Sequence, residues 1–205
     1  MYSIGAVTLV VHGPRRSLRF AHADDAPRLF ELGADPAVTR FFSWGPYTSL
    51  EQPEAYIAGL EARRSAGTLM DFLIVDPDEG PIGVTGLSEV AVRDRRATVG
   101  SWLGQPYWGS GANFEGKAMI THLAFEVLGF ERLTAWANTR NGRSQRALER
   151  IGFRREGVLR DWHRHGDVTH DVVVFGLLRA GWERGPLRSV PVRVEGAPPE
   201  AFHVG

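Results

Sequence analysis

The chain has 205 residues, of which 43% are hydrophobic and 23% are charged, and its 24 basic side chains are matched by 24 acidic ones. This composition is typical of a globular protein with one core, and the balanced charge gives no overall field that would favour nucleic acid or an anionic membrane as a partner. The sequence contains no cysteine, which excludes disulfides, thiolate metal sites and a cysteinyl acyl-enzyme. It has neither a secretory-signal pattern at its start nor an apolar run of membrane-spanning length, so we expect a cytoplasmic protein.

The first half of the chain predicts short strands, helices and then an antiparallel meander. Two β segments are expected at residues 7–12 and 18–22, and helices are expected from about 26 to 33 and from about 51 to 67. Three strand-like segments follow, separated by charged or Gly- and Pro-containing turns, at residues 70–75, 81–92 and 97–103.

The second half predicts a β–α–β unit. A helix is expected over residues 113–128, with a broad apolar face and with Glu115, His122 and Glu126 on the opposite, polar face. The strand at 131–137 follows directly, so it should run parallel to the strand before the helix. Further along, the pattern predicts a helix capped by Asn141 and a hairpin of residues 156–162 and 169–178.

A glycine-rich turn, YWGSGAN at residues 107–113, lies between the strand at 97–103 and this helix. Glycine allows a left-handed φ and a close approach of the backbone to a ligand. The helix start adds unpaired N–H groups and the positive end of the helix dipole. The turn is therefore suited to a phosphate or pyrophosphate, although a single G-x-G pattern does not identify the nucleotide.

The chain becomes rich in proline and glycine near its end. We expect one folded domain over residues 1–184 and a tail over 185–205, with an edge strand at 189–194. The tail could also serve as a dimer or interdomain contact.

Three motifs in this order resemble the GNAT superfamily of acyl-CoA-dependent N-acyltransferases, and within it the branch of the RimJ/RimL-type ribosomal-protein N-terminal acetyltransferases. The segment 107–115 is similar to the Y-W-G-x-G-x-x-x-E pattern of that branch, and 141–153 is similar to N-x-x-S-x-x-x-L-x-x-x-G-F. Residues 83–103 are similar to its G-x-x-x-L … G-x-W-L core strands. The resemblance covers roughly residues 7 to 180.

The resemblance implies an α/β (α+β) fold in which a mixed, mostly antiparallel sheet of about seven strands carries helices on both faces. It also implies that acyl-CoA is the co-substrate, with no metal. The residues expected to bind it are Trp102, Leu103 and Gly104 on the strand, Trp108, Gly109, Ser110, Gly111, Ala112, Asn113 and Phe114 in the turn and helix start, and Asn141 and Ser144.

Two positions depart from the family pattern. Pro106 stands where Gln or Arg is frequent, and Thr98 stands where the branch often has a carboxylate that serves as the general base. Because an amine nucleophile must lose a proton, Glu89 is the first choice for the base. By resemblance, Ser144 could donate a proton to the leaving thiolate, although a buried serine can also bond its own helix.

The acceptor is less constrained than the donor. Trp44, Tyr47, Ser88 and Glu89 are expected to border the acceptor groove, and the acceptor could be a small-molecule amine or a protein N-terminus. Acetyl is the default acyl group, and succinyl is another option. The alternative function is an acyl-CoA-binding regulatory module that has lost its base.

Two further features have plainer explanations. His163, His165 and His170 cluster in the final hairpin like metal ligands, but a surface hairpin explains them as well. Lys117 is the only lysine in the chain, which indicates a GC-rich genome or, alternatively, selection against self-acylation.

Overall fold

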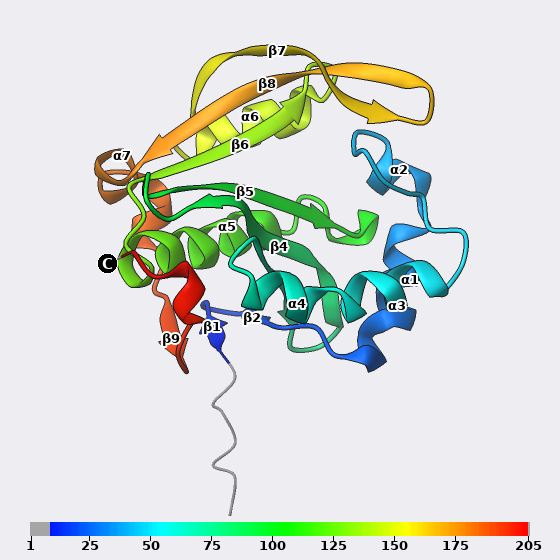
Figure 1. Cartoon of the computed structure of the whole chain (residues 1–205), viewed down its shortest axis with the longest axis horizontal. Coiled ribbons are helices and arrows are strands. Elements are labelled where there is room, and N and C mark those ends of the chain that lie inside the picture. The colour runs from blue at the N-terminus through cyan, green and yellow to red at the C-terminus, as the bar shows by residue number, and fades with distance from the viewer. Residues whose placement is uncertain (1–8, 205) are drawn as a thin grey trace, which may run out of the picture.

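The computed structural model describes residues 9–204, which form one mixed β-sheet flanked by helices (Figure 1). The order of strands across the sheet is β7-β8-β6-β5-β4-β3-β2-β1-β9. The strands are β1 (Val10–His12), β2 (Ser17–Arg19), β3 (Leu69–Asp76), β4 (Gly80–Ala91), β5 (Arg96–Leu103), β6 (Arg132–Asn138), β7 (Arg154–His165), β8 (Val168–Leu178) and β9 (Arg193–Glu195). The described part of the chain thus gives a sheet of nine strands where about seven were expected. Residues 7 and 8 of the first predicted strand lie outside the described residues.

All neighbouring strands in this sheet are antiparallel except β5 and β6, which are parallel. The chain crosses between them through α5 (Ala112–His122) and a π-helical turn (Leu123–Val127), so the predicted β–α–β unit is confirmed. The parallel pairing covers only Arg96–Thr98 with Arg132–Thr134. Beyond these residues the two strands separate, which leaves an opening in the middle of the sheet.

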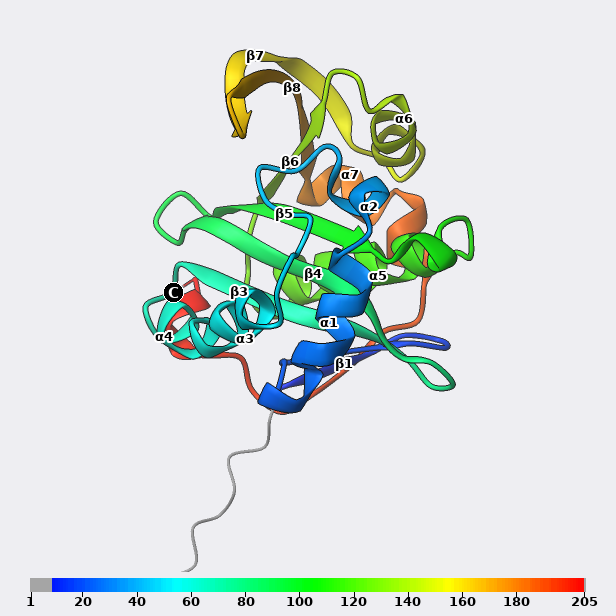
Figure 2. The same cartoon turned by 90° about the vertical axis from the view of Figure 1, so that its right-hand side faces the viewer.

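The remaining helices are α1 (Ala26–Gly33), α2 (Pro36–Thr39), α3 (Glu51–Ala58), α4 (Leu60–Ser65), α6 (Gly142–Arg150) and α7 (Arg179–Glu183). Figure 2 shows α3 and α4 on one face of the sheet and α5 and α6 on the other. The larger core, around Phe125 and Phe175, packs α5 against the sheet. A smaller core around Leu29 and Leu73 lies on the α1 and α3 side. The sheet is therefore covered on both faces, as the resemblance implied.

The predicted polar face of the helix expected at 113–128 is wrong for Glu115, whereas Glu126, in the π-helical turn that follows α5, is exposed as expected. Glu115 is only 8% exposed. Its carboxylate accepts hydrogen bonds from the backbone N–H groups of Arg15 (2.7 Å) and Arg16 (2.8 Å). It also forms an ion pair with the Arg16 guanidinium at 3.0 Å. His122 is partly buried beside Trp182. Most of the helix is thus buried, and Glu115 is held by partners distant in sequence.

The C-terminal segment lies along the edge of the sheet. β9 pairs antiparallel with β1, and the preceding residues Pro186–Ser189 form a 3₁₀ turn. Phe202 is fully buried, and the Val204 N–H donates to the Leu128 carbonyl at 3.2 Å. No helix within residues 9–204 combines the length and the apolar character needed to cross a membrane.

Candidate functional site

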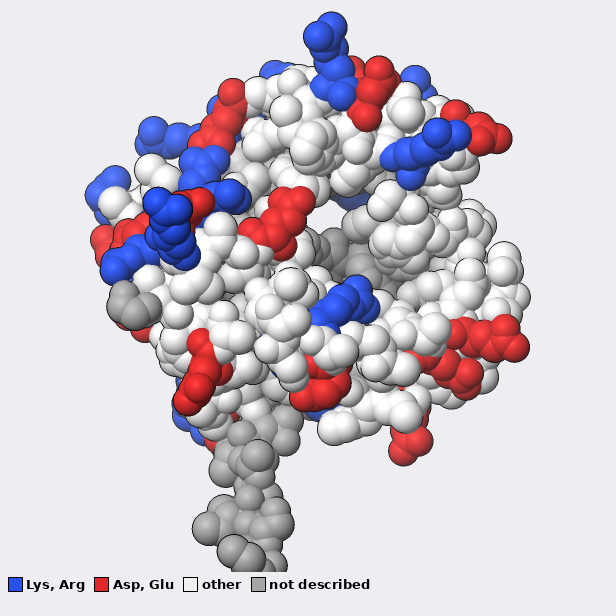
Figure 3. Space-filling model, viewed as in Figure 1, with Lys and Arg blue, Asp and Glu red and all other residues white. Residues whose placement is uncertain are grey.

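A cavity of about 370 Å³ occupies the opening where β5 and β6 separate. Figure 3, viewed from the same side as Figure 1, shows a hollow bordered mostly by uncharged side chains. The lining comes from α2 and its following loop, β5, the glycine-rich turn, α5, β6 and α6: Ala37, Val38, Phe41, Phe42, Val99, Gly100, Ser101, Trp102, Leu103, Trp108, Gly109, Asn113, Lys117, Ala135, Trp136, Ala137, Asn138, Asn141, Arg143, Ser144, Ala147 and Leu148. The charged side chains among these described residues are two cations and no carboxylate, which suits an anionic ligand.

The glycine-rich turn reaches the cavity through backbone conformations that glycine permits. Gly109 has φ 80° and Gly111, the N-cap of α5, has φ 83°. A Cβ atom at either position would meet no other atom within 4 Å, so the left-handed backbone, not crowding, is what requires glycine there. The turn directs the start of α5, with its unpaired N–H groups, toward the cavity mouth.

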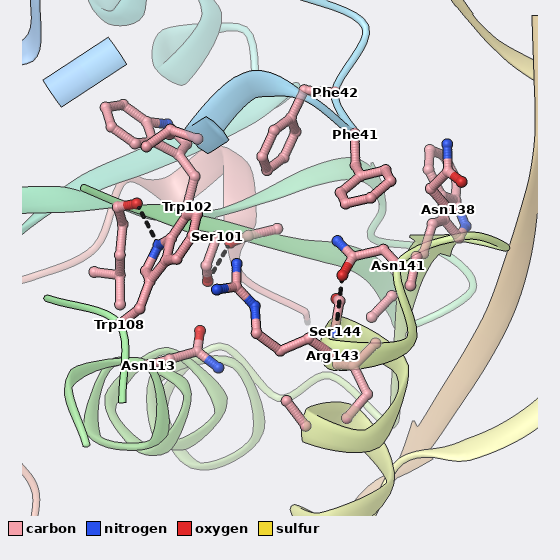
Figure 4. Close-up of a pocket in the computed structure, with 18 of the residues that line it drawn as sticks. Phe41, Phe42, Ser101, Trp102, Trp108, Asn113, Asn138, Asn141, Arg143 and Ser144 are labelled. Atoms are coloured by element: carbon pink, nitrogen blue, oxygen red, sulfur yellow. Dashed lines mark hydrogen bonds between the residues drawn. The ribbon is translucent and has the colours of Figure 1, made fainter. Parts of the chain in front are cut away.

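Trp108 ties this turn to the sheet and to α6. Its indole N–H donates to the Leu103 carbonyl at 2.9 Å, and the Arg143 guanidinium stacks on its ring at 3.6 Å from the centroid. Figure 4 shows the Arg143 side chain extending from α6 into the cavity between Trp108 and Ser144. A cation is thus available close to the N–H groups of the turn.

The predicted cap of α6 is confirmed, since the Asn141 side chain accepts the Ser144 N–H at 3.1 Å. Asn141 and Ser144 both line the cavity (Figure 4). The cap therefore fixes the first turn of α6 at the cavity wall and holds Ser144 there.

A second cavity, of about 470 Å³, lies on the α1 and α3 side of the sheet. Its lining is rich in aromatic side chains and comprises Phe42, Trp44, Tyr47, Gln52, Tyr56, Arg63, Leu69, Asp71, Val84, Gly86, Ser88, Gly100, Ser101 and Trp102. Trp44 packs edge-on against Trp102, with 5.4 Å between the ring centroids. The two cavities share Phe42, Gly100, Ser101 and Trp102, so they meet at β5.

Asp71 brings a carboxylate to this second cavity. The Tyr56 hydroxyl donates to it at 2.7 Å. Burial raises the pKa of Asp71 to about 6, although the Tyr56 hydrogen bond and the Arg63 guanidinium oppose the rise. Asp71 can therefore exchange a proton near neutral pH, which a general base requires.

Glu89 lies outside both sets of lining residues and is exposed, at a left-handed φ of 49°. The Thr98 hydroxyl donates to its carboxylate at 2.8 Å. Thr98, at the position where the resemblance led us to expect an acid, therefore binds an acid from the neighbouring strand. Ser88, one residue earlier, lines the second cavity.

The β7–β8 hairpin contacts the loop that carries Trp44 and Tyr47, where the His165 imidazole hydrogen-bonds to the Gly45 carbonyl at 2.9 Å. Burial and the neighbouring His170 lower the pKa of His163, against the pull of Glu89. Within residues 9–204, no group of three or more His, Cys, Asp or Glu side chains is placed to hold a metal ion.

Apart from Glu89, which lines neither cavity, the sequence-predicted residues divide into three groups. Those that line the first cavity are Trp102, Leu103, Trp108, Gly109, Asn113, Asn141 and Ser144. Gly104, Ser110, Gly111, Ala112 and Phe114 adjoin it without lining it, and Trp44, Tyr47 and Ser88 line the second cavity.

Four charged residues line these cavities without having been predicted as site residues: Arg63, Asp71, Lys117 and Arg143. Asp71 interrupts the apolar run MDFLIV, Arg143 lies inside the N-x-x-S motif, and Lys117 is the sole lysine. An isolated charge in an apolar strand or helix is the pattern that could have identified Asp71 and Lys117.

Comparison with known families identifies the domain. The family model for the acetyltransferase (GNAT) domain matches residues 15–154, which is more than half of the chain.

Curated relatives cover most of the chain. The uncharacterized N-acetyltransferase p20 of Bacillus licheniformis is 29% identical over 166 residues, which is 80% of this chain and 93% of p20. The [ribosomal protein uS5]-alanine N-acetyltransferase of Escherichia coli is 29% identical over 182 residues, covering 83% of this chain and 91% of that enzyme. A crystal structure from T. thermophilus, described as a candidate acetyltransferase, is 31% identical with a TM-score of 0.74 and covers 89% of this chain and 94% of its own.

Proposed function

The chain belongs to the GNAT acetyltransferase family and is an acyl-CoA-dependent N-acyltransferase, and on this premise we propose how its two cavities divide the reaction. The first cavity binds acyl-CoA, and the second binds the amine. The amine attacks the thioester directly while both substrates are bound, so the acyl group is never carried on the protein during turnover.

The observation that carries this proposal is the junction of the cavities. Phe42, Gly100, Ser101 and Trp102 line both of them, so a thioester in the first cavity and an amine in the second would meet at β5. Holding two reactants at such a junction lowers the entropic barrier of the reaction.

The donor would be held by groups that match its chemistry. Its pyrophosphate would accept hydrogen bonds from the backbone N–H groups between Gly109 and Phe114, next to the Arg143 guanidinium. Its pantetheine arm would run beside Trp102–Gly104, at the edge of β5 that β6 leaves free. A backbone N–H there would polarise the thioester carbonyl. The cavity residues need no metal for these roles.

Two groups would handle the protons. Ser144, held at the cavity wall by Asn141, would donate to the leaving thiolate. The acceptor ammonium must lose a proton to a carboxylate. Two carboxylates are candidates for this role. Glu89 is supported by its contact with Thr98, and Asp71 by its place in the lining of the second cavity.

The acceptor is a primary amine carried by a protein N-terminus or a small molecule. A relative acts on the alanine of ribosomal protein uS5, and the open, aromatic second cavity could admit a chain terminus of that kind. Such a reaction would take place in the cytoplasm.

The test is calorimetric titration with acetyl-CoA, succinyl-CoA and free CoA, followed by an amine panel with detection of the released thiol. Micromolar binding of an acyl-CoA and thiol release that depends on amine support the proposal. Absence of binding by all three ligands contradicts it. Binding without turnover on any amine would favour the regulatory module instead.

A matched pair of variants tests the glycine-rich turn. Gly111→Ala forces a left-handed backbone on alanine and should re-aim the start of α5, which weakens acetyl-CoA binding about tenfold. Gly166→Ala, in the β7–β8 turn at φ 58° and equally uncrowded, carries the same kind of strain away from the first cavity and should leave binding unchanged. Equal effects of the two variants would mean that only stability was measured.

A further inference from the structure

Lys117 occupies an unusual position for the only lysine of the chain. It lies on α5, is 4% exposed and lines the first cavity. Its Nζ donates to the Ser101 hydroxyl at 2.7 Å, the one hydrogen bond to Nζ among the described residues. No Asp or Glu side chain, which could neutralise it, is among the described residues that line this cavity.

The partner of Lys117 is one of the residues at which the cavities meet. Ser101 lines both of them, and its hydroxyl also lies 2.7 Å from that of Thr85 on the paired strand. The Lys117 amine therefore lies beside the point where the thioester and the acceptor would react, approaching from the α5 face of the sheet. The acceptor cavity lies on the opposite face.

We propose that Lys117 is a site of self-acylation, at which the protein transfers the acyl group of its bound acyl-CoA to its own Nζ when no acceptor amine is present. The inference rests on the proposed function, because the donor must be acyl-CoA in the first cavity. The neutral amine forms an N–C bond with the thioester carbonyl carbon while the C–S bond breaks. The proton released from nitrogen goes to the thiolate, which leaves as free CoA, and the lysine becomes an uncharged amide.

The environment of Lys117 favours the nucleophilic form. Burial lowers the pKa of Lys117 to about 7. At neutral pH about half of the amine is then unprotonated, a fraction about a thousand times larger than for an ordinary exposed lysine. A desolvated lysine of this kind is the usual form of a nucleophilic lysine.

The experiment incubates the full-length protein with acetyl-CoA at neutral pH, without an amine, and follows the intact mass over time. We expect the mass to rise by one acetyl group, and a peptide map to place that group on Lys117. Lys117→Met and Lys117→Arg should stay unmodified. The same chain unfolded in urea should acylate far more slowly, because its lysine is protonated. Since the map uses the unaltered protein, the result does not depend on whether either variant folds.

Calorimetry on the same sample separates the possible failures. Acetyl-CoA binding with an unchanged mass overturns self-acylation and leaves the proposed function intact. Modification at the N-terminal amine alone, or at equal rates in folded and unfolded chains, also overturns it. If acetyl-CoA does not bind, the proposed function itself fails.

Discussion

At the scale of single residues, the first cavity (the proposed donor cavity) and the second (the proposed acceptor cavity) differ in the charges of their lining residues. The described lining of the donor cavity has cations without carboxylates, whereas the acceptor cavity pairs one carboxylate, Asp71, with the hydroxyl of Tyr56. A carboxylate with a pKa near 6 is ionised at neutral pH and still basic enough to draw a proton from an ammonium group. Its place in the lining of the second cavity and its raised pKa together favour Asp71 over Glu89 as the base.

This preference leads to a prediction for Asp71→Asn. The variant should keep acetyl-CoA binding and lose about 100-fold in kcat/KM, because the amide cannot accept the proton. For the unaltered protein, kcat/KM should rise with pH up to about 6, as Asp71 ionises, and that limb should vanish in the variant. Steady-state rates from about pH 5 to 8 measure both effects. If Glu89→Gln removes the limb instead, Glu89 is the base.

Tyr56→Phe gives an independent check of the same assignment. The Tyr56 hydrogen bond lowers the pKa of Asp71, so its loss should move the acidic limb of the rate profile to higher pH while catalysis persists. An unchanged limb would show that the titrating group is not Asp71.

At the scale of elements, α5 shows how a charged residue can join parts of the chain far apart in sequence. Glu115 in its first turns accepts two N–H groups from the turn between β1 and β2 and pairs with Arg16. The Arg16 guanidinium also lies 3.0 Å from Asp76 at the end of β3, and both partners are buried. This network sets the position of the helix whose start faces the donor cavity.

We predict that Glu115→Gln lowers the free energy of unfolding by about 3 kcal/mol, because a buried guanidinium loses one of its two counter-charges. Urea unfolding measures the loss of free energy, provided that the dependence of the unfolding free energy on urea concentration is unchanged. The matched control is Glu156→Gln, which breaks the more exposed pair with Arg132 and should cost under about 1 kcal/mol. Equal losses in both variants would contradict a structural role for the network.

The elements were more predictable than the contacts between them. Apolar periodicity and turn residues act locally, so the β–α–β unit and the Asn141 cap could be predicted from sequence. The burial of Glu115 could not, since its partner Arg16 lies 99 residues away. The same holds for Asp71 and Lys117, because each meets its partner, Tyr56 or Ser101, only when a helix packs on the sheet.

At the scale of the whole molecule, the question is whether the residues after 184 are part of the folded domain. β9 covers the free edge of β1, and Phe202 and Leu187 are at most 1% exposed within the larger core. An uncovered edge strand is a template for aggregation. These contacts indicate that the segment stabilises the domain, whereas an interdomain or dimer clasp would contribute little to folding.

Truncation after residue 184 distinguishes the two roles. We predict that the shortened chain aggregates or unfolds, because it exposes the β1 edge and the pocket left by Phe202.

Phe202→Ala in the full chain should lower the free energy of unfolding by about 3–5 kcal/mol, the usual cost of removing a buried ring. Val168→Ala, at a side chain that is 56% exposed, should change it by less than about 0.5 kcal/mol. Circular dichroism and light scattering report folding and assembly together. A truncated chain that stays folded, binds acetyl-CoA and only changes from dimer to monomer would establish the clasp instead.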